Sequence, residues 1–188
     1  MKFLLTCLLL AATSLGFSQT NDSISNAISR ESGKQELSLN AFNLVDFGIV
    51  DITYERIISE NSTWAIEAFY HPTKDDYLND AYYKELSLTG KYKHFFSSKY
   101  ARGFYVHGFG MLSNGEYEDG YYYDAGVDDY IYDTYDYTDF AIGFGLGGKF
   151  VSKGGFLLDL SGGIGRNLFS ERSPTIAGQF MVNLGYRF

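Results

Sequence analysis

The sequence predicts an all-β protein in which eight antiparallel strands close into a barrel, and three observations lead to this fold class. The chain of 188 residues holds 17 Tyr, 16 Phe and 21 Gly but only two Pro, a composition that favours strands broken by glycine bends over disorder. Apolar residues alternate with small or polar ones through successive segments, so each segment has two different faces. Short connections alternate with longer ones, and the length suits a single domain.

The first 18 residues are expected to be a secretory signal peptide and not part of the fold. A positive start at Lys2 is followed by an apolar run, and Gly16 and Ser18 supply the small residues that precede a cleavage site. The run of about 15 residues is shorter than the ~20 that a membrane-spanning helix needs. We therefore expect cleavage after Ser18, a flexible periplasmic lead-in over residues 19–35, and a barrel over residues 36–188.

Eight segments alternate strongly enough to be expected as strands, and each has about the 9–11 residues that cross a bilayer as a tilted strand. The last segment is the clearest, because every second residue from Ile176 to Phe188 is apolar or glycine. Two segments are less regular: Arg56 falls on an apolar face, and residues 103–114 carry bulky apolar side chains on both faces. The expected strands cover residues 36–43, 49–58, 64–70, 85–96, 103–114, 140–150, 156–165 and 176–188.

The connections between these strands differ in length in a regular way. If the N-terminus is periplasmic, all the short turns fall on the periplasmic side and both long loops fall outside, as in transmembrane barrels. The short turns are Ser59–Thr63, Ser97–Arg102 and Ser152–Gly155; the long loops are His71–Tyr83 and Gly115–Tyr137; Val45–Gly48 and Arg166–Ser173 are of modest length.

The chemistry of the two strand faces indicates which one points inward. The less apolar face of residues 140–150 consists of four small residues and Lys149. A water-facing surface should be rich in charge, whereas small residues suit the crowded interior of a small barrel. The apolar face is therefore expected to meet lipid, which requires a closed sheet. Aromatic residues near the strand ends fit interfacial girdles: Tyr70, Phe96, Phe150, Phe156, Tyr186 and Phe188.

The C-terminal run Phe180-Met181-Val182-Asn183-Leu184-Gly185-Tyr186-Arg187-Phe188 carries a family resemblance. Alternating apolar residues that end in an aromatic resemble the signal that barrel-assembly machinery recognises. Over residues 36–188 the chain resembles the small eight-stranded outer-membrane barrels of the OmpA-like and OmpX-like kind, and the wider outer-membrane β-barrel families of Gram-negative bacteria. The resemblance implies a transmembrane β-barrel in the outer membrane, in contact with its lipid, whose assembly depends on the strand ending at Phe188. It implies little about activity.

Charged residues on the inward face are the first candidates for function. Because an unpaired charge inside a narrow barrel is costly, opposite signs should pair there. A salt-bridge network that fills the lumen and a gated ion path or proton relay are the two interpretations, and eight strands leave no free water channel. The predicted inward charges are Asp51, Glu55, Glu67, Glu85, Lys91, Lys93, Lys149, Asp159 and Arg187.

The segment Gly115–Tyr137 is the most unusual part of the chain, since it interleaves acidic residues with Tyr and contains no Lys or Arg. Tyr offers a large contact area at low entropic cost, which favours an extracellular protein or glycan partner. Carboxylates could also capture calcium, although the spacing does not match an EF-hand loop. The third interpretation is a hairpin that extends past the membrane and is kept soluble by its acidic side chains. Its acidic residues are Glu116, Glu118, Asp119, Asp124, Asp128, Asp129, Asp133 and Asp136.

No catalytic, cofactor or metal site is assigned. The only Cys is Cys7, inside the expected signal peptide, and the net charge of −8 disfavours nucleic acid. An outer-membrane enzyme acting on lipid or peptide would need one of His71, His94 and His107 beside a Ser and an acid. The glycine run at residues 143–148 matches a nucleotide fingerprint but no helix is expected after it. We expect a structural or surface-interaction role through residues 115–137; the enzyme and a soluble ligand-binding barrel are the alternatives.

Overall fold

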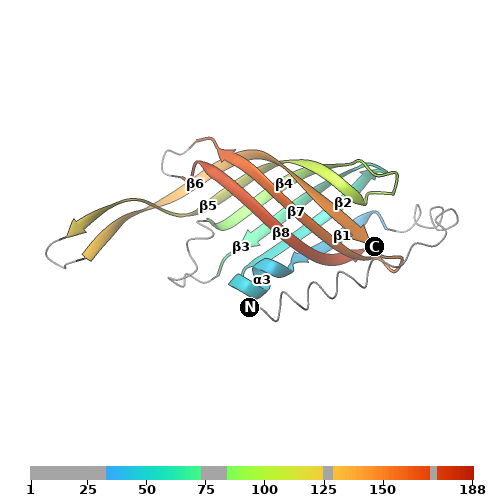
Figure 1. Ribbon diagram of the computed structural model, residues 1–188, viewed down its shortest axis with the longest axis horizontal. Coiled ribbons are helices and arrows are strands. Elements are labelled where there is room, and N and C mark those ends of the chain that lie inside the picture. Colours follow the sequence, from blue (N-terminus) through green and yellow to red (C-terminus); the bar gives the residue numbers. More distant parts are fainter. Residues whose placement is uncertain (1–32, 73–83, 125–128, 170–172) are drawn as a thin grey trace. The chain divides into compact units, whose positions relative to one another are not determined.

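The barrel predicted from sequence is confirmed in a computed structural model of the chain. The structure describes residues 33–72, 84–124, 129–169 and 173–188, with side chains described outside residues 117–134. Eight strands, each antiparallel to its neighbours, form a closed barrel in which β1 pairs with both β2 and β8 (Figure 1). The predicted signal peptide and nearly all of the predicted lead-in lie outside the described residues. Among the described residues, no helix is both long enough and apolar enough to cross a membrane.

The strands follow the predicted order, but several of them begin or end at residues other than those predicted. At one end of the barrel, here named the C-terminal end, the backbones of Gln35 and Phe188 exchange hydrogen bonds of 3.1 and 2.8 Å. The opposite end is named the hairpin end. The elements are β1 Gln35–Asn40, α3 Ala41–Phe47, β2 Val50–Ser59, β3 Ser62–Tyr70, β4 Lys84–Phe95, β5 Gly103–Asp124, β6 Asp129–Val151, β7 Phe156–Asn167 and β8 Ile176–Arg187.

The alternation of side chains places polar and small residues in the interior and large apolar residues on the outside. In β4, for example, Lys91 and Lys93 are buried while Leu88 and Tyr92 are more than half exposed. The predicted assignment of the two faces is therefore observed. Arg56 does share the outer face of β2, where it lies beside Trp64 near the C-terminal end.

The ambiguous strand β5 is explained by the glycines opposite it. Tyr105, His107 and Phe109 all point inward and are buried. Their neighbours on β6 are glycines: a Cβ at Gly145 would lie 2.5 Å from Cε1 of His107, and a Cβ at Gly147 would lie 2.5 Å from the Tyr105 ring. Both faces of β5 can carry bulky residues because its inner rings occupy the space that side chains on β6 would need.

The first connection is a helix and not the predicted loop. β1 ends at Asn40 instead of residue 43, and α3 follows at once. The Asn40 side chain accepts a hydrogen bond from the Asn43 backbone N–H (3.3 Å), and Gly48 ends the helix with a left-handed φ of 66°. Asn is a favoured N-cap and Gly a favoured C-cap, so these two residues replace the end of the predicted strand with a helical turn.

The long loop predicted over residues 115–137, for which a protruding hairpin was one interpretation, is largely strand, because β5 continues to Asp124 and β6 begins at Asp129. The β5–β6 ladder runs from Gly103–Lys149 to Asp124–Asp129, with one register shift between Glu118 and Tyr121. Figure 1 shows this two-stranded ribbon extending well past the other strands. The paired register persists because Tyr and other strand-forming residues recur along both arms.

Candidate functional site

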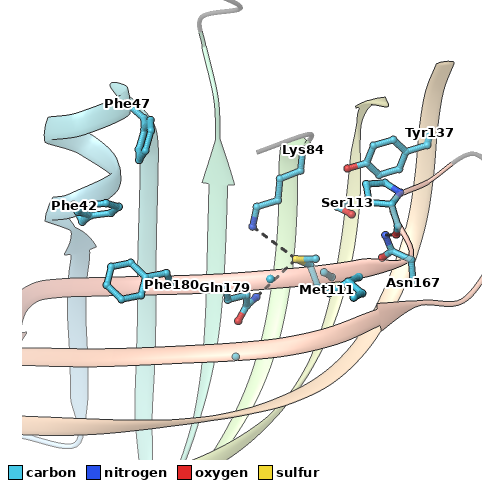
Figure 2. A pocket seen from close by; sticks show the side chains of 14 residues that line it. Phe42, Phe47, Lys84, Met111, Ser113, Tyr137, Asn167, Gln179 and Phe180 are labelled. Carbon is cyan, nitrogen blue, oxygen red and sulfur yellow. Dashed lines mark hydrogen bonds between the residues drawn. The ribbon is translucent and has the colours of Figure 1, made fainter. Parts of the chain in front are cut away.

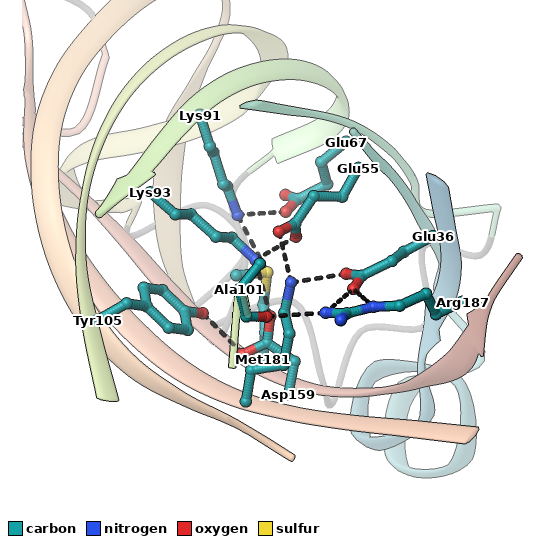
Figure 3. A network of polar contacts seen from close by, with 11 residues as sticks. Glu36, Glu55, Glu67, Lys91, Lys93, Ala101, Tyr105, Asp159, Met181 and Arg187 are labelled. Carbon is teal, nitrogen blue, oxygen red and sulfur yellow. Dashed lines mark hydrogen bonds and ion pairs between the residues drawn. The ribbon is translucent and has the colours of Figure 1, made fainter. Parts of the chain in front are cut away.

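The lumen near the C-terminal end is filled by a connected set of ion pairs (Figure 3). Lys149 Nζ donates to Glu36 Oε2 at 2.6 Å and also to Glu55. Lys93 Nζ lies 2.7 Å from both Glu55 Oε2 and Asp159 Oδ2. Strands β1, β2, β4, β6 and β7 are thereby joined across the interior by side chains alone.

Both ends of this chain of contacts are also fixed. Arg187 donates through Nε to Glu36 Oε1 at 2.6 Å and through a terminal nitrogen to the Ala101 carbonyl at 2.8 Å. At the other end the Tyr105 hydroxyl donates to Asp159 Oδ1 at 2.7 Å. The network therefore reaches β5, β8 and the turn that precedes β5.

A second ion pair lies beside this network. Lys91 of β4 pairs with Glu67 of β3 and contacts the sulfur of Met181 at 3.1 Å. The two groups together hold four cations, Lys91, Lys93, Lys149 and Arg187, against four anions, Glu36, Glu55, Glu67 and Asp159. The charges cancel, which is what burial in a narrow interior requires.

Most of the predicted inward charges are therefore found in the interior. Asp51, Glu55, Glu67, Lys91, Lys93, Lys149 and Asp159 are buried, and Arg187 is nearly so. Glu85 is the exception: a bulge between Lys84 and Leu86 shifts the register there, so that Lys84 is buried and Glu85 is partly exposed.

Three buried charged residues were not among the predicted set: Glu36, Lys84 and Asp139. Glu36 alternates with Leu37 and could have been found from that pattern alone. Lys84 and Asp139 lie just beyond the ends of their predicted strands. Asp139 accepts from the backbone N–H of Phe169 at 2.9 Å and from the Ser173 hydroxyl at 2.5 Å. It thus fastens the β7–β8 connection to β6.

A cavity of about 500 Å³ lies at the hairpin end of the lumen (Figure 2). Lys84, Met111 and Gln179 contribute to its walls from three strands, and Phe42 and Phe47 contribute from α3. The helix is held there because Asn40 and Asn43 each donate a 3.0 Å hydrogen bond to the Asp51 carboxylate. This end of the lumen retains empty space.

The three histidines lie in separate environments. His107 is buried, and neither ring nitrogen has a hydrogen-bond partner among the described residues. His94 is exposed on the outside of β4, with its ring centroid 5.4 Å from that of Phe96. His71 follows β3; partial burial lowers its pKa, and the charge of Glu85 opposes that shift. The structure does not bring any two of them together.

The remaining motifs have structural explanations. The run Gly143–Gly148 lies inside β6, where its inward glycines accommodate the rings of β5. Asn61 is exposed in the turn between β2 and β3. Of the acidic residues in the 115–137 segment, Glu116 and Asp136 have described side chains, and the other six lie outside the described side chains.

Comparisons with protein-family models, with curated proteins and with solved structures find no match for this chain.

Proposed function

We propose that this chain is an outer-membrane β-barrel of the OmpA-like and OmpX-like kind, exported by a signal peptide over residues 1–18. The single observation that carries the proposal is the distribution of apolar surface around the barrel. Large apolar side chains are exposed on all eight strands; Phe144 is 70% exposed, Phe150 63% and Ile142 59%. Soluble monomers rarely expose contiguous apolar patches beyond a few hundred Å², so this surface is suited to acyl chains.

The interior supports the same proposal. A soluble ligand-binding barrel keeps an apolar, open lumen for its ligand. Here the C-terminal half of the lumen is closed by buried ion pairs such as Lys93–Asp159. Polar groups inside and apolar groups outside are the reverse of a water-soluble protein. The sheet is closed by the β1–β8 ladder as far as the Asn40–Asn183 pair, and hydrocarbon favours such pairing of the backbone.

The last strand supports assembly in that membrane. Phe188 directly follows β8, exchanges backbone hydrogen bonds with Gln35 and is 55% exposed. We propose that barrel-assembly machinery recognises this strand, and that its terminal aromatic then contributes to an interfacial girdle together with Tyr186 and Phe156, both more than half exposed.

We further propose that the β5–β6 hairpin, residues 115–137, is the interacting part. It extends past the other strands into what would be the extracellular space, and its arms have no neighbouring strand beyond the Lys84–Gly115 and Ala141–Asn167 pairs in the described ladders. Its acidic, Tyr-rich sequence suits a protein or glycan partner. The role is structural or adhesive, and we assign no catalytic residue to it.

Electrophoresis of membrane fractions tests the location. The protein should sediment with the outer membrane and, if unheated, migrate differently in SDS from a boiled sample, because a closed barrel resists the detergent until heated. Recovery in the soluble periplasmic fraction would overturn the proposal. A variant that lacks residues 119–133 should retain the heat-dependent shift and lose binding of cells to a protein or glycan surface. Loss of the shift instead would make the hairpin part of the fold.

A further inference from the structure

The barrel wall is incomplete beside α3. The β1–β8 ladder ends at the Asn40–Asn183 pair, whereas the β7–β8 ladder continues to Arg166–Ile176. Residues 176–182 of β8 therefore have α3 beside them where a strand would otherwise continue. A helix cannot extend the ladder of backbone hydrogen bonds. The Asn40 side chain replaces two of these bonds: it donates to the Phe180 carbonyl and accepts from the Val182 N–H, each at 3.3 Å.

The cavity at the hairpin end lies beside this gap. Its walls include Ala177 and Gln179, which point into the lumen, and also Gly178 and Phe180, which point outward. Successive residues of a strand face opposite sides. Because its lining includes residues of both sets, the cavity extends to the edge of β8 beside α3.

The two parts of the cavity differ in chemistry. Its outer part is aromatic: the Phe42 and Phe180 rings meet edge to face at 5.3 Å, and Phe47 lies 5.7 Å from Phe42. Figure 2 shows these three rings to one side and the polar side chains across from them. The inner part contains Lys84, which is 8% exposed.

Two buried oxygens on the cavity wall lack donors. Oε1 of Gln179 and Oδ1 of Asn167 are inaccessible and have no hydrogen-bond partner among the described residues. Gln179 is 8% exposed, and its amide nitrogen donates to the Met111 sulfur at 3.7 Å. Buried acceptors of this kind are normally satisfied by a bound molecule or water. An occupant that reaches these oxygens would donate hydrogen bonds to them.

We infer that this cavity binds a single-chain amphiphile taken from the surrounding bilayer, with its acyl chain in the gap between α3 and β8 and a hydroxylated head group against Gln179 and Asn167. Lys84 would donate to the oxygens of the same head group. The inference that the ligand comes from a bilayer rests on the proposed membrane location. The cavity itself is a feature of the fold and does not depend on that location. Occupancy by the chain's own lead-in segment is a separate outcome of the test.

Photolabelling in detergent tests the site. The probe is decyl maltoside with a diazirine at the end of its chain, added to the protein purified in dodecyl-dimethylamine oxide, whose head group donates no hydrogen bond at neutral pH. We expect saturable labelling of residues 41–47 and 176–182 that excess decyl maltoside removes. Labelling spread evenly over the outward strand faces would overturn the inference.

Three variants separate the site from the general apolar surface. Ala177→Phe adds a ring on the cavity side and should abolish the saturable labelling. Gly90→Phe, on the outer face of β4 with no atom within 4 Å of an added Cβ, is the matched control and should not change it. Gln179→Leu is nearly isosteric and should weaken maltoside competition roughly fivefold. This is the change in affinity that corresponds to the free energy of one hydrogen bond.

The heat-dependent mobility shift is measured on each variant, and Gln179→Leu carries the test if Ala177→Phe does not fold. Saturable labelling that persists in both cavity variants would contradict the inference. Labelling that is seen only after residues 19–32 are removed would make this chain's own segment the occupant. None of these results depends on fractionation, so failure of the proposed membrane location is recognised separately.

Discussion

At the scale of single residues, glycines make the crowded interior possible. Gly145 lies against His107, and an added Cβ would be 2.5 Å from Cε1 of the imidazole. Gly148, on the outward face of the same strand, has its nearest neighbour at 3.9 Å. Gly145→Ala should lower the unfolding free energy by about 1–3 kcal/mol, and Gly148→Ala should change it by less than ~1 kcal/mol. Urea unfolding in lipid vesicles, followed by the fluorescence of the only Trp, compares them; equal losses would contradict the packing argument.

Each buried charge is stable in the interior only because a partner of opposite charge lies beside it. Glu55 accepts from both Lys93 and Lys149, so Glu55→Gln would leave the interior with one excess positive charge. We expect a loss of about 3–5 kcal/mol, which is typical of breaking a buried pair. The same unfolding measurement checks this, with the exposed Lys153→Gln as a control that should cost less than ~0.5 kcal/mol. Adding Lys149→Met to Glu55→Gln restores neutrality and should recover part of the loss; no recovery would mean that charge balance is not what stabilises the interior.

At the scale of elements, α3 depends on one side chain that serves two purposes. Asn40 caps the helix at Asn43 and also bonds to Asp51 and to the backbone of β8. Asn40→Ala should therefore release residues 41–48, with a loss of about 1 kcal/mol for the cap alone, and leave β4 to β7 unaffected. Hydrogen exchange should be faster in α3 and at Val182 and unchanged at Val106. Uniformly faster exchange would show that α3 is part of the global unfolding unit.

The strands, the helix and the cavity differ in how well the sequence predicts them. Period-two alternation predicted the eight strands and their inward faces, because one apolar face per strand is a strong signal. The helix over 41–47 was missed because its cap and its contact with Asp51 are tertiary. A hairpin over residues 115–137 was among the interpretations, but the continuation of β5 and β6 beyond Gly115 and Tyr137 was not predicted because the polar residues there resemble a loop. The cavity could not have been predicted, since it results from where β1 ends relative to β8.

At the scale of the whole molecule, the proposal requires that the outward surface be solvated by hydrocarbon, and depth in the membrane then controls the cost of a charge. Leu146 is 58% exposed near the middle of the outward row of β6, and Phe150 is 63% exposed near its end. In a bilayer, Leu146→Arg should cost about 2–4 kcal/mol and Phe150→Arg about 0–1 kcal/mol. In a soluble barrel both positions would face water, and either substitution would be nearly neutral. Unfolding titrations of the two variants in vesicles measure the difference, and equal costs at the two depths would contradict a transmembrane orientation.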